Sequence, residues 1–442
     1  MTQRHTITAV LTIPGLTGTA IPGQMLSVGL MVDNEHLFWG ECVGTADFQA
    51  EPATATVRQV VQPRLQGQPI TSFKEIATLL TGLTEKVTLT KTTITPTPPP
   101  PPGPSRRSLL RGQWTADPPA PPQPITESYE VERPVASAIG YGLSQALLVA
   151  VAWTQNKSVI QVLGDEYGLD QPQTAVPLHA EINPNIPLSI PTITNSPIAS
   201  IGYSISGTNP IVELGQDGEV LQRFARQLKE ELIKTADPQS LAFYFNVRGG
   251  YGVLREDKLG QILGMLYGLE KAAEPFLVRV EDPFILDDRD EQIKKMANLK
   301  SYLRTRRMKL QLVAHAGIQS AADAQAFVER KAAHMLVIDL PQMGSLAESI
   351  TAVLAAQQQG IGVLLGGSPD ETQLAAQSSL HLALALQPTL LLAKPGRLGD
   401  TGIATAYNEM NRLLTIPTVL SPLPLPPDSR QKNKPRGGSQ PL

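Results

Sequence analysis

The sequence contains very little cysteine, few aromatic side chains and no strong excess of either charge. Its 442 residues include one cysteine, Cys42, so an intramolecular disulfide framework and a cysteine-rich zinc site are excluded. The net charge of −3 gives no broad attraction to nucleic acid or to an anionic membrane. No apolar run reaches the roughly 20 residues that a membrane span needs. The N-terminal "MTQRHTITAV" lacks the apolar core of a signal peptide. We therefore expect a cytoplasmic protein that binds neither nucleic acid nor membrane.

Proline, in contrast, is abundant, with 39 residues that gather in two places. Residues 92–125 read "TTITPTPPPPPGPSRRSLLRGQWTADPPAPPQPI", and proline cannot donate the backbone hydrogen bond that a helix or sheet requires. We predict a disordered or polyproline-II insertion there, which is either an unselected loop expansion or a ligand for a proline-binding partner domain. A similar Pro-rich disordered tail is predicted at 415–442.

The N-terminal part has the pattern of an α+β domain, expected over 1–91 and 126–170. Short runs rich in β-branched residues predict strands at 6–13, 26–32 and 36–42. Segments 53–65 and 73–83 have the character of helices. Between 131 and 168 the apolar residues recur at helical spacing, which predicts a long buried helix followed by a shorter one.

From residue 175 the pattern becomes eight short apolar strands, each followed by a segment long enough for a helix. The strands are "AVPLHAEI", "SIGYSIS", "AFYFNV", "FLVRVED", "LQLVAHA", "MLVIDL", "GVLLGG" and "LLLAKP". Alternating strands and helices imply a parallel sheet, and eight of them predict a (β/α)₈ barrel over 171–414. The expected fold class is α/β, a barrel with an N-terminal α+β capping domain.

Reactive groups in such barrels lie at the carboxyl ends of the strands, and four consecutive strands end in polar residues here. These are Asn246, Glu281, His315 and Asp339. By strand alternation, arginines share the faces of Asn246 and Glu281; they are Arg248 and Arg279. Asp339, alone at the end of "HMLVID", is open to three interpretations: a metal ligand, a base, or a replacement for another residue.

Seven segments carry a resemblance to a known family. They are "PGLTG" at 14–18, "AIGYGLSQALLVAVA", "RVEDP", "HMLVIDLPQMGS", "GGSPDET", "LAKPG" and "YNEMNRLL". With these segments in this order, the chain resembles the methylaspartate ammonia-lyases of the enolase superfamily. The resemblance implies a Mg²⁺-dependent, reversible elimination of ammonia from 3-methylaspartate to mesaconate. It also implies a homodimer and a small dicarboxylate or amino-acid ligand.

The positions that the resemblance assigns to this reaction hold other residues here. The three metal-binding acids fall on Asn246, Glu281 and His315, and the Lys base falls on Asp339. The family's His on the second strand falls on Tyr203 or Ser204.

Substrate-binding positions of the family fall on Glu181, Ser368 and Pro369. From the strand pattern itself, Arg248 is a further candidate, as a clamp for a substrate carboxylate. His179 and Lys394 are interpreted as structural.

These substitutions change the expected chemistry. One carboxylate, one amide and one imidazole make a poor site for Mg²⁺, which prefers anionic oxygens. An Asp with an unperturbed pKa of roughly 3.9 is a weak and short base. An ion-pair network of Glu281 and Asp339 with His315, Arg279 or Arg248 could take the place of the metal. Three hypotheses follow: an active lyase, a non-catalytic homologue that binds a small anion or a partner, or a different reaction with Asp339 and His315 as an acid–base pair.

Overall fold

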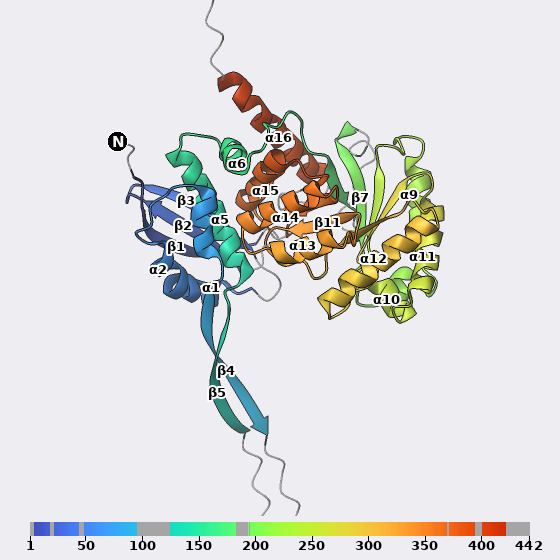
Figure 1. The fold of residues 1–442 in the computed structure, drawn as a ribbon, viewed down its shortest axis with the longest axis horizontal. Helices are drawn as coiled ribbons and strands as arrows, with labels where there is room; N and C mark the ends of the chain where they lie inside the picture. Colours follow the sequence, from blue (N-terminus) through green and yellow to red (C-terminus); the bar gives the residue numbers. More distant parts are fainter. Residues whose placement is uncertain are drawn as a thin grey trace, which may run out of the picture. The chain divides into compact units, whose positions relative to one another are not determined.

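The computed structural model describes residues 4–17, 22–43, 48–94, 124–182, 193, 195–368, 371–393 and 400–420. These residues form two compact units, one of residues 1–81 with 136–442 and a small one of residues 82–135. Figure 1 shows the larger unit as a strand-rich N-terminal part and a barrel surrounded by helices. The predicted combination of a barrel with an N-terminal α+β part is therefore confirmed.

The N-terminal part is built on an antiparallel sheet of three strands in the order β1–β2–β3. The predicted strands are confirmed, with bounds β1 Ile7–Leu16, β2 Pro22–Val32 and β3 His36–Val43. Short helical segments follow, namely α1 Ala50–Thr56, the π-helical turn Val57–Val61, α2 Gln62–Leu65, α3 Phe73–Ala77 and the 3₁₀ turn Thr78–Leu80.

Helix α5 (Ser137–Thr154) joins the sheet to the barrel, and α6 (Val159–Tyr167) follows it. The α5 helix lies so close to β3 that a Cβ on Gly40 would be 1.9 Å from the carbonyl oxygen of Gly142. Among the placed helices it alone has the length and hydropathy of a membrane span, but 72% of that stretch is buried inside the structure. The predicted long buried helix is thus confirmed, although it begins at 137 because residues 131–134 belong to a strand.

All eight predicted barrel strands are present and close into a parallel barrel. Each strand is short because only a few apolar residues separate the preceding helix from the polar mouth. The bounds are β6 Leu178–Glu181, β7 Ile198–Ser204, β8 Ala242–Asn246, β9 Leu277–Glu281, β10 Gln311–Ala314, β11 Met335–Asp339, β12 Gly362–Gly366 and β13 Leu390–Leu392.

Helices cover the outside of the barrel, and apolar side chains fill its interior. The interior cluster contains Tyr244, Val313, Met335, Val337, Leu364 and Leu390. The helices are α8 Pro210–Leu214, α9 Glu219–Leu232, α10 Gly250–Arg255, α11 Leu259–Ala273, α12 Arg289–Thr305, α13 Ala321–Glu329, α14 Leu346–Gln358, α15 Gln373–Leu386 and α16 Asp400–Leu420.

The small unit is a two-stranded antiparallel hairpin, and our sequence prediction missed it. Strand β4 (Thr84–Ile94) pairs with β5 (Pro124–Pro134) over eleven residue pairs. The predicted insertion at 92–125 therefore starts and ends inside strands, and its middle, 95–123, lies outside the residues the structure describes. The missed signal was the alternation in "VTLTKTTI" and "ITESYEVE", which is typical of a strand.

The first residues of the predicted tail belong to a helix. Helix α16 continues to Leu420, beyond position 415 where we expected the tail to start. Residues 421–442 lie outside the described ranges.

Candidate functional site

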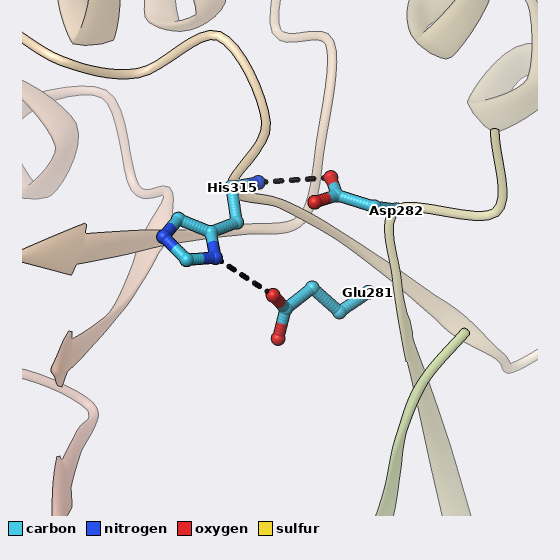
Figure 2. A group of neighbouring side chains, drawn as sticks. All are labelled: Glu281, Asp282 and His315. Atoms are coloured by element: carbon cyan, nitrogen blue, oxygen red, sulfur yellow. Dashed lines mark hydrogen bonds and ion pairs between the residues drawn. The ribbon is translucent and has the colours of Figure 1, made fainter. Parts of the chain in front are cut away.

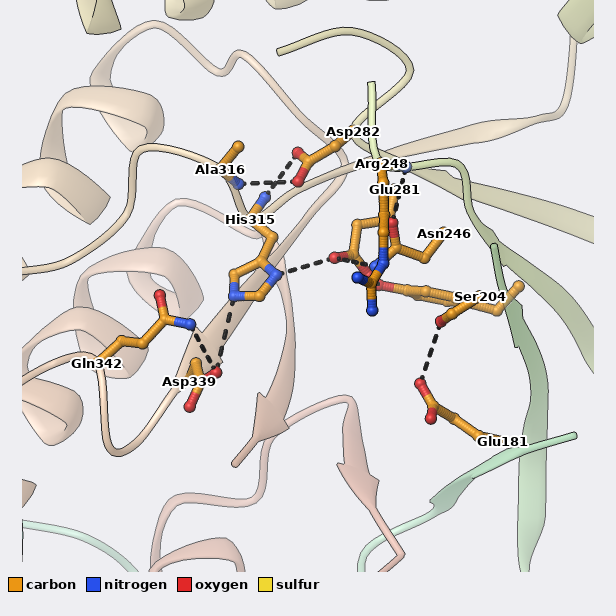
Figure 3. Close-up of polar contacts among 11 residues, drawn as sticks. Glu181, Ser204, Asn246, Arg248, Glu281, Asp282, His315, Ala316, Asp339 and Gln342 are labelled. Carbon is orange, nitrogen blue, oxygen red and sulfur yellow. Dashed lines mark hydrogen bonds and ion pairs between the residues drawn. The ribbon is translucent and has the colours of Figure 1, made fainter. Parts of the chain in front are cut away.

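The barrel mouth is formed by the inward-facing residues at the carboxyl ends of β8 to β11. Register pairs Asn246 with Glu281 across β8 and β9, and alternation turns both side chains inward with Tyr244 one layer below. His315 follows β10 directly, and Asp339 is the last residue of β11. Figure 3 shows these side chains converging from neighbouring strands. The sequence prediction that four strand ends would meet in one place is therefore confirmed.

Glu281 is the centre of this arrangement. Its side chain is only 6% exposed, yet both carboxylate oxygens are hydrogen-bonded. Tyr244 donates its hydroxyl to Oε2 at 2.5 Å, while Asn246 Nδ2 and His315 Nδ1 approach Oε1 at 2.8 and 2.9 Å. Burial alone would raise the pKa of Glu281, but the hydrogen bond and charge of His315, aided by Tyr244, hold it below its usual range. Glu281 is therefore a carboxylate neutralised by protein groups.

The amide of Asn246 has one orientation that satisfies its neighbours. Its Oδ1 accepts a hydrogen bond from the backbone N–H of Arg248 at 3.0 Å, so the amide oxygen is turned away from Glu281. Its Nδ2 donates to Glu281. If the amide oxygen and nitrogen were exchanged, the oxygen would face the Glu281 carboxylate and the NH₂ group would face the backbone N–H of Arg248. Asn246 thus presents a donor to the centre of the mouth.

His315 lies between two acids. Nδ1 meets Glu281 at 2.9 Å, and Nε2 lies 3.9 Å from Asp339 Oδ2. Burial alone would lower the pKa of His315, but the Glu281 carboxylate, assisted by the charges of Asp282 and Asp339, raises it to about 9. His315 is consequently a cation at neutral pH, and the predicted ion pair between it and the two acids is confirmed.

Asp339 has a second neighbour on its own loop, because Gln342 donates Nε2 to Oδ2 at 3.0 Å. Among the residues that the structure describes, the other oxygen, Oδ1, is buried without a hydrogen-bond partner, as is Nε2 of His315. Within that part of the chain, these two side chains of opposite charge therefore have an unused acceptor and an unused donor.

Asp282, which our sequence analysis did not select, fixes the backbone at His315. Its carboxylate accepts the backbone N–H groups of His315 and Ala316 at 3.0 and 2.9 Å. Figure 2 shows the two consecutive acids in contact with His315, Glu281 at the ring and Asp282 at the main chain. Burial, together with the charge of Glu281, raises the pKa of Asp282. Its signal was its place in the quoted "RVEDP", immediately after a strand end.

Two predicted residues of the first strands also meet at the mouth. Ser204 donates its hydroxyl to Glu181 Oε1 at 3.3 Å, as Figure 3 shows. Tyr203, the alternative to Ser204, faces the other side of β7, where its ring lies 4.6 Å from that of Phe224 on α9. Strand alternation explains the difference, since consecutive residues point to opposite faces.

The arginines do not form the expected ion pairs with the acids of the mouth. Arg279 donates Nε to Gln311 at 3.0 Å, and its buried Nη1 has no hydrogen-bond partner in the described part of the chain. Arg248 is exposed and contributes its backbone N–H to Asn246. Within the described ranges neither guanidinium forms an ion pair with Glu281 or Asp339, so His315 alone supplies that charge there. Arg279 is too low in the barrel, one inward-facing layer below Glu281.

The remaining predicted positions are only partly visible. Ser368 lies in the loop after β12, and its carbonyl oxygen accepts the backbone N–H of Glu371 at 3.3 Å. Pro369 and Lys394 lie outside the part of the chain that is described. His179 is fully enclosed, with Nδ1 3.0 Å from Ser200 Oγ. Burial lowers the pKa of His179 to about 4, which agrees with a structural, neutral histidine.

The N-terminal part supports the rim of the mouth through two carboxylates. Glu41 of β3 accepts the Thr372 hydroxyl and, at 3.2 Å, the backbone N–H of Ala375 in the first turn of α15. On α5, Tyr141 donates its hydroxyl to Glu371 at 2.8 Å. These contacts hold the β12–α15 loop, and the sequence gave no sign of them because they join residues more than 200 positions apart.

The donor set does not suit Mg²⁺. Glu281, Asp282 and His315 have ligand atoms within 4.8 Å of one another, but hydrogen-bond donors already occupy Glu281 and Asp282. Asn246 presents its NH₂ group, and the ring nitrogen of His315 nearest to Glu281 carries a proton. Mg²⁺ requires near-octahedral oxygen ligands that are preferably anionic, and these residues offer no such set.

Comparison with known proteins supports the assignment of fold and family. The family model of the methylaspartate ammonia-lyase C-terminus matches residues 205–418. Methylaspartate ammonia-lyase 2 of Carboxydothermus hydrogenoformans is 28% identical over 418 residues, which cover 91% of this chain and 89% of that protein. The methylaspartate ammonia-lyase of Clostridium tetanomorphum is 25% identical over 422 residues, 93% of this chain and 91% of that one.

Solved structures have the same fold. The Citrobacter amalonaticus methylaspartate ammonia lyase containing (2S,3S)-3-methylaspartic acid superposes with a TM-score of 0.74 at 20% identity, covering 93% of this chain and all of that one. Muconate cycloisomerase from Pseudomonas fluorescens, at 13% identity, gives a TM-score of 0.57 over 91% of this chain and 89% of that one.

Proposed function

We propose that the chain is a divergent member of the methylaspartate ammonia-lyase family that has lost, or retains only weakly, the elimination of ammonia from 3-methylaspartate. The proposal rests on Asp339, which the resemblance of the sequence assigns to the position of the family's Lys base. A general base must reach the proton that it removes and have a pKa near the working pH. Asp339 is shorter than Lys by several bonds, and it faces the His315 cation at 3.9 Å.

Two side chains already lie against the Oδ2 oxygen of Asp339. The His315 ring is 3.9 Å away, and Gln342 donates Nε2 to it at 3.0 Å. A substrate that offered a proton to this oxygen would have to compete with both contacts. Loss of a positioned base costs about 10²–10⁴-fold in rate, and the lack of a fitting Mg²⁺ site removes further stabilisation of an enolate.

The test measures the conjugated product of the elimination by its ultraviolet absorbance. The full chain and the Clostridium tetanomorphum relative are assayed side by side with 3-methylaspartate, Mg²⁺ and K⁺. We expect kcat/KM of this chain to be at least about 10³-fold below that of the relative. A kcat/KM less than about 10³-fold below that of the relative would show that the ancestral reaction survives, and the proposal would be wrong.

A second candidate, an acid–base reaction on a small ligand, is favoured by one observation. His315 Nε2 and Asp339 Oδ1 are buried and have no hydrogen-bond partner among the residues whose positions are described, so a ligand could accept a hydrogen bond from one and donate to the other. Small dicarboxylates and amino acids are the ligand class we propose, in a cytoplasmic homodimer. Thermal-shift screening of such compounds tests this, and a true ligand should lose its effect in Asp339→Asn.

A further inference from the structure

We infer that His315 takes the structural place of a divalent cation, so that the acids of this barrel mouth are neutralised without any metal. The inference concerns the same site as the proposed function and relies on it only for the family assignment. It predicts a property of binding, which can be measured without any turnover.

Glu281 has three of its roughly four acceptor sites in use. Asn246 and His315 donate to Oε1 at 2.8 and 2.9 Å, and Tyr244 donates to Oε2 at 2.5 Å. A metal that bound Oε1 or both oxygens would therefore have to displace one of these donors. Glu281 is buried, and a hydrogen-bond donor left without its acceptor inside a protein is costly.

Asn246 and His315 are also oriented unfavourably for a metal. Asn246 turns its Oδ1, the atom that could bind a metal, to the backbone N–H of Arg248 at 3.0 Å. The hydrogen-bonded Nδ1 of His315 faces Glu281 with its proton. Both residues therefore present hydrogen atoms, and so positive charge, to the place where a cation would require lone pairs.

His315 connects two acids on different strands. Its ring contacts Glu281 of β9 and faces Asp339 of β11 at 3.9 Å, and its backbone N–H is fixed by Asp282. In such a mouth, a metal has the structural role of bridging carboxylates from separate strands. Here the side chain of His315 makes that bridge, and a second cation beside it would be repelled.

The experiment titrates the full chain with Mg²⁺ and with Mn²⁺ by calorimetry, using Glu281→Gln as the baseline for adventitious binding. For the unchanged chain we expect no heat above that baseline, which corresponds to a Kd weaker than about 10 mM. A saturable site that Glu281→Gln removes would overturn the inference.

A back-substitution tests whether His315 stands in a cation's place. The double variant Asn246→Asp/His315→Asp exchanges the amide and the imidazole for carboxylates and leaves Glu281 between them. We expect it to bind Mn²⁺ at least about 10-fold more tightly than the unchanged chain, and its melting temperature to rise when the metal is added. If it gains no binding, this centre is not the place of a cation and the inference is wrong.

A measurement on the unchanged chain covers the case in which the double variant does not fold. The ring signals of the six histidines are observed by NMR with isotope-labelled histidine, and His315→Gln identifies the one from His315. We expect this signal to be unaffected by Mg²⁺. A saturable shift on adding Mg²⁺ would contradict the inference, and neither result depends on whether the chain turns over 3-methylaspartate.

Discussion

At the scale of the residue, the pairing of His315 with Glu281 makes stability depend on pH in a definite direction. Contact with the carboxylate raises the pKa of His315 to about 9, above the roughly 6.5 expected in the unfolded chain. Because the folded protein holds the proton more tightly, this contribution is fully present below pH 6.5 and is lost as the pH rises through 9.

We predict that the free energy of unfolding falls by about 2 kcal/mol between pH 7.5 and 9.5 because His315 loses its proton. Urea unfolding at several pH values measures it. The three histidines whose pKa burial lowers to about 4 have finished titrating below this range; they are His179, His334 and His381.

His315→Gln provides the comparison, because it retains a polar side chain but has no charge to lose. The thiol of Cys42, whose pKa burial raises, contributes the same slope in both proteins and cancels from the difference. Parallel profiles for the two proteins would mean that His315 is not the charged partner of Glu281.

Single residues were predicted best where strand alternation decides the direction of a side chain. The meeting of Asn246, Glu281, His315 and Asp339 follows from their positions at strand ends. The choice between Tyr203 and Ser204 could not be made without the register of β7. The sequence also could not decide whether His315 or an arginine pairs with the acids. Arg279 lies deeper in the barrel than the acids, and the sequence does not encode that depth directly.

At the scale of the element, α5 depends on glycines that allow backbone to approach backbone. A Cβ on Gly140 would lie 2.2 Å from the carbonyl oxygen of Gly344, in the loop between β11 and α14. Ser144, one turn further along α5, accepts the backbone N–H of Leu346 at 2.9 Å at the start of α14. This helix therefore holds the loop that follows Asp339.

We predict that Gly140→Ala lowers the free energy of unfolding by about 2 kcal/mol or more, since a backbone atom has to move. Gly264→Ala in α11 is the matched control, because nothing lies within 4 Å of the added Cβ. Alanine is the better helix former, and we expect this control to gain up to about 1 kcal/mol. Chemical unfolding of both variants measures the contrast, and equal effects would refute the close contact.

Elements were predictable wherever the apolar pattern was strong. All eight barrel strands and α5 have enough apolar residues to be recognised from the sequence. Strands β4 and β5 were missed because their alternation is weak: Thr, Lys and Glu occupy most positions, and the neighbouring prolines suggested a loop. In a two-stranded hairpin, contacts with the partner strand provide the stabilisation that apolar burial provides elsewhere.

At the scale of the whole molecule, the hairpin of β4 and β5 is a separate unit. Its residues 88–92 and 128–130 are exposed, so its side chains contribute little to a common core. At its base, Val135 donates its backbone N–H to Leu83 at 2.9 Å. Leu83 is 7% exposed and belongs to the buried set.

We predict that replacing residues 84–134 by Asn-Gly changes the melting temperature by less than about 3 °C, because a two-residue turn can join Leu83 to Val135. Thermal unfolding followed by circular dichroism measures it. A chain in which only 95–123 is replaced serves as the control that retains both strands. A fall of more than about 10 °C in the first protein alone would mean that the hairpin supports the larger unit.

The register of the hairpin has a practical use in imaging. Eleven pairs run from Thr84 opposite Pro134 to Ile94 opposite Pro124, so the two far ends are adjacent and lie about 34 Å from the base at 3.4 Å per residue. A rigid reporter domain whose own termini are close together could be grafted across Ile94 and Pro124 without stretching either strand. The molecule thus has an attachment point for a fiducial marker, remote in sequence from the barrel mouth.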